Sequence, residues 1–179
     1  MANRSRFLLA LLSALMLTTS PLDLMAQGKP GAEARLKERN ITLPNAPAAV
    51  GNYVDAVRVG NLLFVSGNTS RDFEPKGKVG KDLTTEQGYQ AARHAGLLFL
   101  AKVRVTLGSL DRVKRVVKVF GMVNSTDGFA DQPKVMNGFS DLMVEVFGES
   151  VGKHARSAVG MAALPGGAPV EVEAILEVE

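Results

Sequence analysis

The sequence predicts an α+β protein in which strands and helices follow the order ββαβαββ and the helices lie on one face of a sheet. Three observations carry this prediction. Two β-prone runs flank Gly60-Asn61, a capping box opens a long helix at Thr84, and apolar residues recur at helical spacing between Val135 and Phe147. The 179 residues, 46% apolar and 22% charged, fit one globular domain with an appendage and exclude global disorder.

The first 26 residues have the order of a secretory signal peptide. Arg4 and Arg6 precede the apolar run FLLALLSALML, and a short polar stretch follows. Because a membrane-spanning helix needs roughly 20 apolar residues, this shorter run predicts a signal peptide cleaved after Ala26, an exported periplasmic or secreted protein, and no membrane anchor after cleavage. The alternative is an uncleaved anchor helix. A chain without cysteine fits an oxidising compartment.

Residues 27–45 are expected to form a leader with one short helix at Ala32–Asn40, where helical propensity is high. The first two strands are predicted at Val54–Val59 and Leu62–Ser66. They form a hairpin because the glycine and asparagine between them tolerate positive φ. The segment Gly67–Leu83 is predicted to be a long loop.

The first long helix begins after Thr84, with Gln87 completing the capping box, and ends before Gly108. Its turns from Leu97 to Val105 are apolar almost all round. Such a helix is buried on two sides, which we interpret as an indication of oligomerisation.

A valine-rich strand is predicted at Val113–Val123, followed by an amphipathic helix that Pro133 opens and Gly148 ends. The last two strands are expected at Ser157–Ala162 and Val170–Val178.

Alternation along the last two strands predicts which side chains share a face. In the last strand the core-facing valines leave Glu171 and Glu173 on the opposite face. In the strand before it, Val159 and Met161 are expected in the core and Arg156 opposite. If the two strands are adjacent, the guanidinium and a carboxylate share one side of the sheet. The alternative is a solvated face with cross-strand ion pairs of about 0.2–1 kcal/mol.

Other chemical motifs are missing from the sequence. The chain has no cysteine, and His94 and His154 are too far apart to suggest a metal site, so none is expected. Gly77–Lys81 lacks the spacing of a phosphate-binding loop. The net charge of +3 and a basic stretch at 112–118 without interleaved aromatic residues give no reason to expect a nucleic-acid partner.

Several segments together resemble the RidA/YjgF family, formerly called the endoribonuclease L-PSP family, over about residues 35–179. They are APAAVGNYV (Ala46–Val54), GNLLFVSG (Gly60–Gly67), HARSAVGMAALP (His154–Pro165) and VEVEA (Val170–Ala174). The stretches Asp111–Gly121 and Asp131–Leu142 are similar to a longer subgroup of that family.

The resemblance implies a chorismate-mutase-like fold with a mixed sheet over residues 46–179. It also implies a homotrimer with ligand sites between subunits. By similarity Arg156 holds the substrate carboxylate and Glu171 positions water. Tyr53, Ser66 and Asn137 match residues that line the family's ligand site.

Enzymes of the family hydrolyse 2-imino or 2-enamino acids to 2-keto acids and ammonia, and they need no cofactor or metal. Two features keep alternatives open. Ala158 stands where many active members have cysteine, and the predicted export separates the chain from cytoplasmic imino acids. The second hypothesis is therefore a trimer that binds small carboxylates or another metabolite without turnover. The third is a ribonuclease, which usually wants an acid/base pair that cannot be identified around His94.

Overall fold

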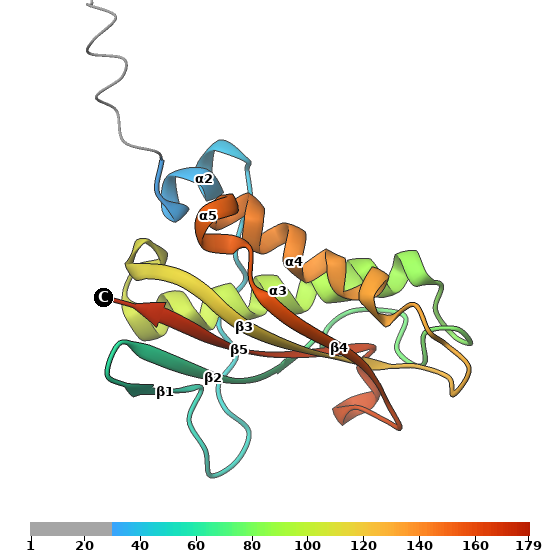
Figure 1. The fold of residues 1–179 in the computed structure, drawn as a ribbon. Helices are drawn as coiled ribbons and strands as arrows, with labels where there is room; N and C mark the ends of the chain where they lie inside the picture. Colours follow the sequence, from blue (N-terminus) through green and yellow to red (C-terminus); the bar gives the residue numbers. More distant parts are fainter. Residues whose placement is uncertain (1–29) are drawn as a thin grey trace, which may run out of the picture. The chain divides into compact units, whose positions relative to one another are not determined.

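A computed structural model describes residues 30–179, so the predicted signal peptide at residues 1–26 lies outside the described residues. The five strands form one mixed sheet in the order β1-β2-β5-β3-β4, in which only β3 and β4 are parallel (Figure 1). Their bounds are β1 Ala56–Val59, β2 Leu62–Thr69, β3 Val113–Asn124, β4 Ala155–Met161 and β5 Val170–Val178. The element order confirms the predicted ββαβαββ pattern.

The helices begin and end close to where their caps predict. Thr84 and Gln87 form the capping box of α3 (Thr85–Leu107), and Gly108 ends that helix with a left-handed φ of 81°. Pro133 lies in the first turn of α4 (Gln132–Phe147), and Gly148 follows the last. The short leader helix is α2 (Ala32–Glu38), and the one-turn helix α5 (Glu149–Gly152) was not predicted.

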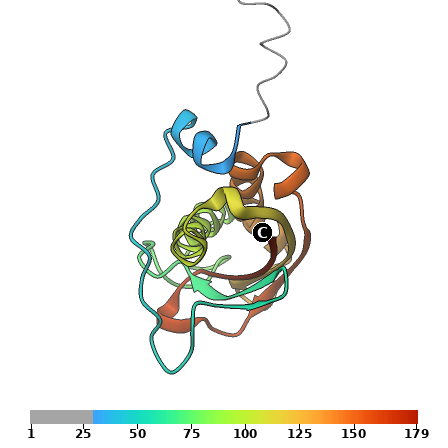
Figure 2. The same ribbon diagram turned by 90° about the vertical axis from the view of Figure 1, so that its left-hand side faces the viewer.

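Helices α3 and α4 pack side by side on one face of the sheet (Figure 2). The rings of Phe99 and Phe139 meet edge to face between them, with centroids 5.4 Å apart. The helices approach closely because glycine lies at the contact: a Cβ at Gly96 would come within 2.8 Å of Leu142 Cδ2. Together with the inward side chains of the strands, this layer forms the core.

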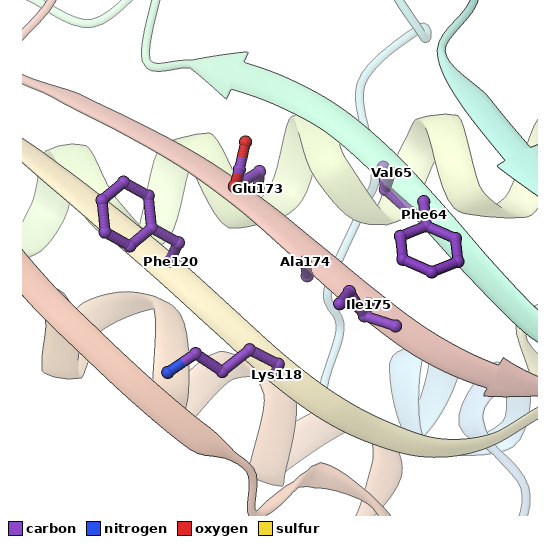
Figure 3. A pocket seen from close by; sticks show the side chains of 7 residues that line it. All are labelled: Phe64, Val65, Lys118, Phe120, Glu173, Ala174 and Ile175. Carbon is purple, nitrogen blue, oxygen red and sulfur yellow. The ribbon is translucent and has the colours of Figure 1, made fainter.

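Among residues 30–179, no helix packs on the other side of the sheet, which is called here the open face (Figures 1 and 2). Strand pairing places Val57, Phe64, Ile175 and Lys118 in one row across this face. Figure 3 shows the last three side chains on adjacent strands, with the helices behind the sheet. Val57 is 53% exposed and Phe64 42%, although both are large apolar residues. Phe64, Ile175 and Lys118 of this row line a depression of about 330 Å³.

The apolar turns of α3 do not support the oligomerisation we inferred from them. Leu98 and Ala101 are only 3% and 2% exposed in the single chain. The segment before β1 lies against this part of the helix, since Lys102 Nζ donates to Asp55 Oδ1 at 2.6 Å. The chain therefore covers both sides of α3 itself, apart from Val105, which is 75% exposed.

Strand β2 is longer than predicted. Its pairing with β5 continues past a register shift between Val65 and Asn68 and ends at Thr69, opposite Glu171. The loop before α3 is therefore shorter than the predicted Gly67–Leu83.

Candidate functional site

Arg156 and Glu171 do not share a face of the sheet, contrary to the sequence prediction. Strand β3 lies between their strands. Arg156 pairs with the buried Val119 and therefore faces the helices, whereas Glu171 pairs with Met122 on the open face. The prediction took β4 and β5 as neighbours, but β4 runs parallel to β3 at the edge of the sheet.

The assignment of faces within β4 was also wrong. Val159 pairs with Met122 and turns toward the open face, and Met161 follows two positions later. All residues of β4 are half-buried or exposed. Its sequence therefore shows too little difference in polarity between the two faces to predict which one points to the core.

Helix α4 holds Arg156 in place through three hydrogen bonds. Nη1 donates to Asn137 Oδ1 at 3.1 Å and to Ser140 Oγ at 2.8 Å, and Nη2 donates to the carbonyl oxygen of Pro133 at 3.1 Å. These three acceptors lie on one stripe of α4, because positions separated by three, four and seven residues share a helix face. Arg156, Asn137, Ser140 and Pro133, together with His154, are called the arginine cluster below.

The guanidinium of Arg156 keeps donors for a further partner. Arginine has five N–H donors, and the three bonds to α4 leave Nε–H and one N–H on Nη2. Among residues 30–179 the structure shows no acceptor for these two. Burial lowers the pKa of Arg156, and the nearby Asp141 carboxylate raises it. The side chain remains a cation with two donors, the number that a bidentate carboxylate accepts.

His154, the residue just before β4, joins this cluster through its contact with Ser140. Its Nδ1 is 2.7 Å from the carbonyl oxygen of Gly152, and its Nε2 is 3.0 Å from Ser140 Oγ. Burial lowers the pKa of His154, the Gly152 bond raises it, and the positive charge of Arg156 lowers it further.

Glu171 belongs to a second group of residues, on β2 and β5. Its carboxylate lies against Gly67, where a Cβ would collide with Oε1. The neighbouring Ser66 donates from Oγ to the carbonyl oxygen of Val54 at 2.7 Å. Tyr53 directly precedes Val54 in the chain. Its side chain is 49% exposed, and its hydroxyl oxygen accepts a hydrogen bond from the backbone amide of Val50. Glu171, Gly67, Ser66 and Tyr53 are called the glutamate cluster below.

The environment of Glu171 favours its protonated form. Burial raises the pKa of its carboxyl group, and the negative charge of Glu173 raises it further. A carboxylate with a raised pKa is a better proton acceptor near neutral pH than an ordinary surface glutamate.

The five predicted site residues thus divide between two places. Arg156 and Asn137 are in direct contact. Ser66 on β2 is next to Gly67, against which the Glu171 carboxylate of β5 lies, and Tyr53 is in the segment before β1. The described chain does not bring the two clusters together. The sequence analysis missed Ser140. The signal that could have found it was a polar residue three positions after Asn137, on the same polar side of an amphipathic helix.

Within residues 30–179 there is no group of three or more His, Asp or Glu side chains arranged to hold a metal ion. In the same part of the chain, none of the helices combines the length and the apolar character needed to cross a bilayer.

The sheet with two helices on one face defines an α+β protein of chorismate-mutase-like architecture. The chain belongs to the YjgF family: residues 33–172 match the family model described as "YjgF/chorismate mutase-like, putative endoribonuclease".

Two relatives show the range of this similarity. Protein TCP17 of Trypanosoma cruzi is 45% identical over 159 residues, which cover 87% of this chain and 98% of that protein. A protein of Dermatophagoides farinae named 2-iminobutanoate/2-iminopropanoate deaminase is 32% identical over 142 residues, 79% of this chain and 98% of its own.

Solved structures agree with the fold. An Agrobacterium tumefaciens protein of unknown function superposes with a TM-score of 0.73 at 42% identity, covering 82% of this chain and 91% of that chain. A structure titled as a putative endoribonuclease from Shewanella oneidensis superposes with a TM-score of 0.79 at 31% identity, covering 83% and 100%.

Proposed function

We propose that the chain is a cofactor-independent hydrolase that converts 2-imino or 2-enamino acids to 2-keto acids and ammonia. Membership of the YjgF family and the 32% identical relative named as an imine deaminase support the proposal. The observation that carries it is the state of Arg156, a fixed guanidinium with two N–H donors left for a carboxylate.

Arg156 suits the carboxylate that every 2-imino acid carries. A planar guanidinium meets a carboxylate with two parallel charge-assisted hydrogen bonds, which fix the direction of the ligand as well as its charge. The imine carbon is adjacent to that carboxylate, so holding the carboxylate also positions the reacting carbon.

Glu171 is the proposed proton acceptor. Water adds its oxygen to the imine carbon and gives a proton to the Glu171 carboxylate. Glu171 passes that proton to the nitrogen, which completes the tetrahedral carbinolamine. It then takes the hydroxyl proton of the carbinolamine and passes it to the nitrogen as the C–N bond breaks, which leaves the 2-keto acid and ammonia. The balance is one imine and one water in, one ketone and one ammonia out. General-base assistance of this kind contributes about 10²–10⁴-fold to a rate.

In this proposal the two clusters meet between copies of a homotrimer. The reason is that one chain holds them on opposite faces, with β3 in between. The apolar row of the exposed Val57 and Phe64 and the half-buried Ile175 supports an association through the open face. Such a patch is uncommon on a protein that stays monomeric.

The proposed hydrolase acts outside the cytoplasm, in the periplasm or after secretion. The support is the charged, apolar and polar order of residues 1–26. Its substrates would then be 2-imino acids or related small carboxylates present in that compartment.

The second candidate is a small-carboxylate-binding protein without turnover. The arginine cluster is complete within a single chain, so binding needs nothing from the glutamate cluster. Ala158 faces the same side of β4 as Arg156 and supplies no reactive group there.

A ribonuclease is a weaker candidate. His94 packs its ring against Phe73, with centroids 6.1 Å apart, and its Nε2 is buried with no hydrogen-bond partner among residues 30–179. Both ring nitrogens of His154 are already engaged within the chain. We therefore propose no nucleic-acid partner.

The deciding experiment measures 2-keto acid and ammonia from an imino acid that an amino-acid oxidase generates in the same cuvette. The proposal expects faster product formation with the wild-type protein than with Arg156→Ala. If both proteins leave the spontaneous rate unchanged, the hydrolase proposal is wrong. Calorimetric binding of 2-oxobutanoate by the wild type alone would then select the binding protein.

A further inference from the structure

A one-way chain of hydrogen bonds runs from Arg156 through Ser140 to His154. The carbonyl oxygen of Gly152 can only accept, so His154 Nδ1 carries the proton of this 2.7 Å bond. In the neutral ring Nε2 is then an acceptor, and the Ser140 hydroxyl donates to it at 3.0 Å. Because the hydroxyl proton of Ser140 points to His154, the lone pairs of Ser140 Oγ are free to accept. Arg156 Nη1 donates to this oxygen at 2.8 Å.

We propose that Ser140 and His154 are positioning residues that orient the Arg156 guanidinium for a ligand carboxylate. This inference rests on the proposed carboxylate-binding role of Arg156. Neither residue needs to touch the ligand: Ser140 fixes Nη1, and His154 fixes the direction of the Ser140 hydroxyl.

Few restraints hold the plane of the Arg156 guanidinium. Without Ser140, Nη1 would keep only Asn137, and Nη2 would keep only the Pro133 carbonyl. Both of these are 3.1 Å contacts, longer than the 2.8 Å bond to Ser140. Loss of the shortest bond lets the plane turn, and a bidentate bond to carboxylate needs a defined plane.

The protonation state of His154 controls the direction of these hydrogen bonds. Protonated His154 would donate from Nε2 to Ser140, and the serine proton would have to leave that direction. It would also place a second positive charge beside Arg156. On α4 the carboxylate of Asp141 acts on Arg156, and Lys153, the residue before His154, pairs with Glu149 of α5. Burial and Arg156 both lower the pKa of His154, so the neutral ring is maintained at neutral pH.

The test uses the full-length protein without ligand, followed by nitrogen NMR. Wild-type His154 should show the tautomer protonated at Nδ1, and the Arg156 Nη groups should exchange slowly by rotation about the Nε–Cζ bond. Ser140→Ala should speed that rotation, Ser140→Thr should restore slow rotation because it keeps a hydroxyl, and Ser150→Ala on the exposed surface should change nothing. As the pH is lowered through the protonation of His154, followed by its own ring nitrogen signals, rotation should speed up in the wild type, whereas His154→Gln should show no such change.

The second arm is calorimetric titration with 2-oxobutanoate. Because a net hydrogen bond is worth about 0.5–1.5 kcal/mol, Ser140→Ala should bind about 2- to 10-fold more weakly, and Ser140→Thr within about twofold of wild type. If the wild type binds no 2-keto acid but the NMR results hold, the proposed function fails and the positioning chain stands. An Nε2-protonated His154, or Arg156 rotation that is equal in wild type and Ser140→Ala, overturns the inference. Should Ser140→Ala fail to fold, the wild-type tautomer and the His154→Gln comparison decide.

Discussion

Arg156 and Glu171 lie on opposite faces of the sheet, on strands that β3 separates. Arg156 is tied to α4, while Glu171 lies over the register shift of β2. The two residues therefore have independent surroundings within one chain. Substitutions at one should leave the structure around the other intact, which makes their functions separable by experiment.

Substituting Arg156 should remove carboxylate binding. A charged hydrogen-bonding partner contributes about 1.5–3 kcal/mol, so Arg156→Ala should weaken 2-oxobutanoate binding by roughly one to two decades. Arg156→Lys should also fail, because an ammonium is a point charge that cannot form the bidentate bond. Calorimetry checks both, with the exposed Arg39→Ala as a control. Wild-type affinity in both Arg156 variants would mean that this arginine only ties β4 to α4.

Glu171→Gln should separate turnover from binding. The amide keeps the shape of the side chain but removes the proton acceptor, so imine hydrolysis should fall by about 10²–10⁴-fold toward the spontaneous rate. Binding of 2-oxobutanoate should stay within a few-fold of wild type. Glu177→Gln, farther along the same strand, provides the control. Full hydrolysis by Glu171→Gln would exclude this residue as the base.

His154 should make the protein less stable in mild acid. Its pKa in the folded chain lies below the ordinary 6.5, so the unfolded chain binds a proton first as the pH falls. Stability is therefore lost from pH 6.5 downward until the folded-state pKa is passed, and then levels off. Thermal melting from pH 8 to pH 5 should show a smaller decrease for His154→Gln than for wild type. Parallel curves for the two proteins would contradict this.

Phe64 should control assembly if copies associate through the open face. Light scattering on the wild type should give about three times the mass of the mature chain. Phe64→Glu puts a charge in the apolar row and should shift the protein toward monomer. Val105→Glu is the control, because this exposed residue lies on α3 on the other side of the sheet. A wild-type monomer at micromolar concentration would refute both the trimer and a site between subunits.

Export should leave a shortened chain. Expression with fractionation and N-terminal sequencing should find a protein that starts at Gln27 outside the cytoplasm, as the predicted cleavage after Ala26 requires. A cytoplasmic product that starts at Met1 or Ala2 would contradict it.

Local signals predicted the elements of this fold well. The capping box at Thr84, the helix-ending Gly108 and the hairpin at Gly60-Asn61 each depend on a few neighbouring residues, and the structure confirms all three. Alternation in β5 also placed Glu171 correctly away from the core, because its core-facing positions are uniformly apolar.

Strand order and the face of Arg156 could not be predicted in the same way. They depend on β3 inserting between β4 and β5, which no local pattern records. The small residues of β4, such as Ala158 and Gly160, gave little contrast between faces. The roles of Ser140 and His154 as partners of Arg156 required knowing that α4 lies over the edge of β4.

The arginine cluster is built almost entirely from contacts between near neighbours in the chain. Arg156 bonds to partners 16, 19 and 23 positions away, all on α4, whereas the β2–β5 pairing that supports Glu171 joins residues about 100 positions apart, as Ser70 and Val170 show. Closing the longer loop costs more chain entropy. During folding the carboxylate-binding half can therefore form early, from one helix and the strand that follows it, while the half that carries the base must wait for β2 and β5 to pair.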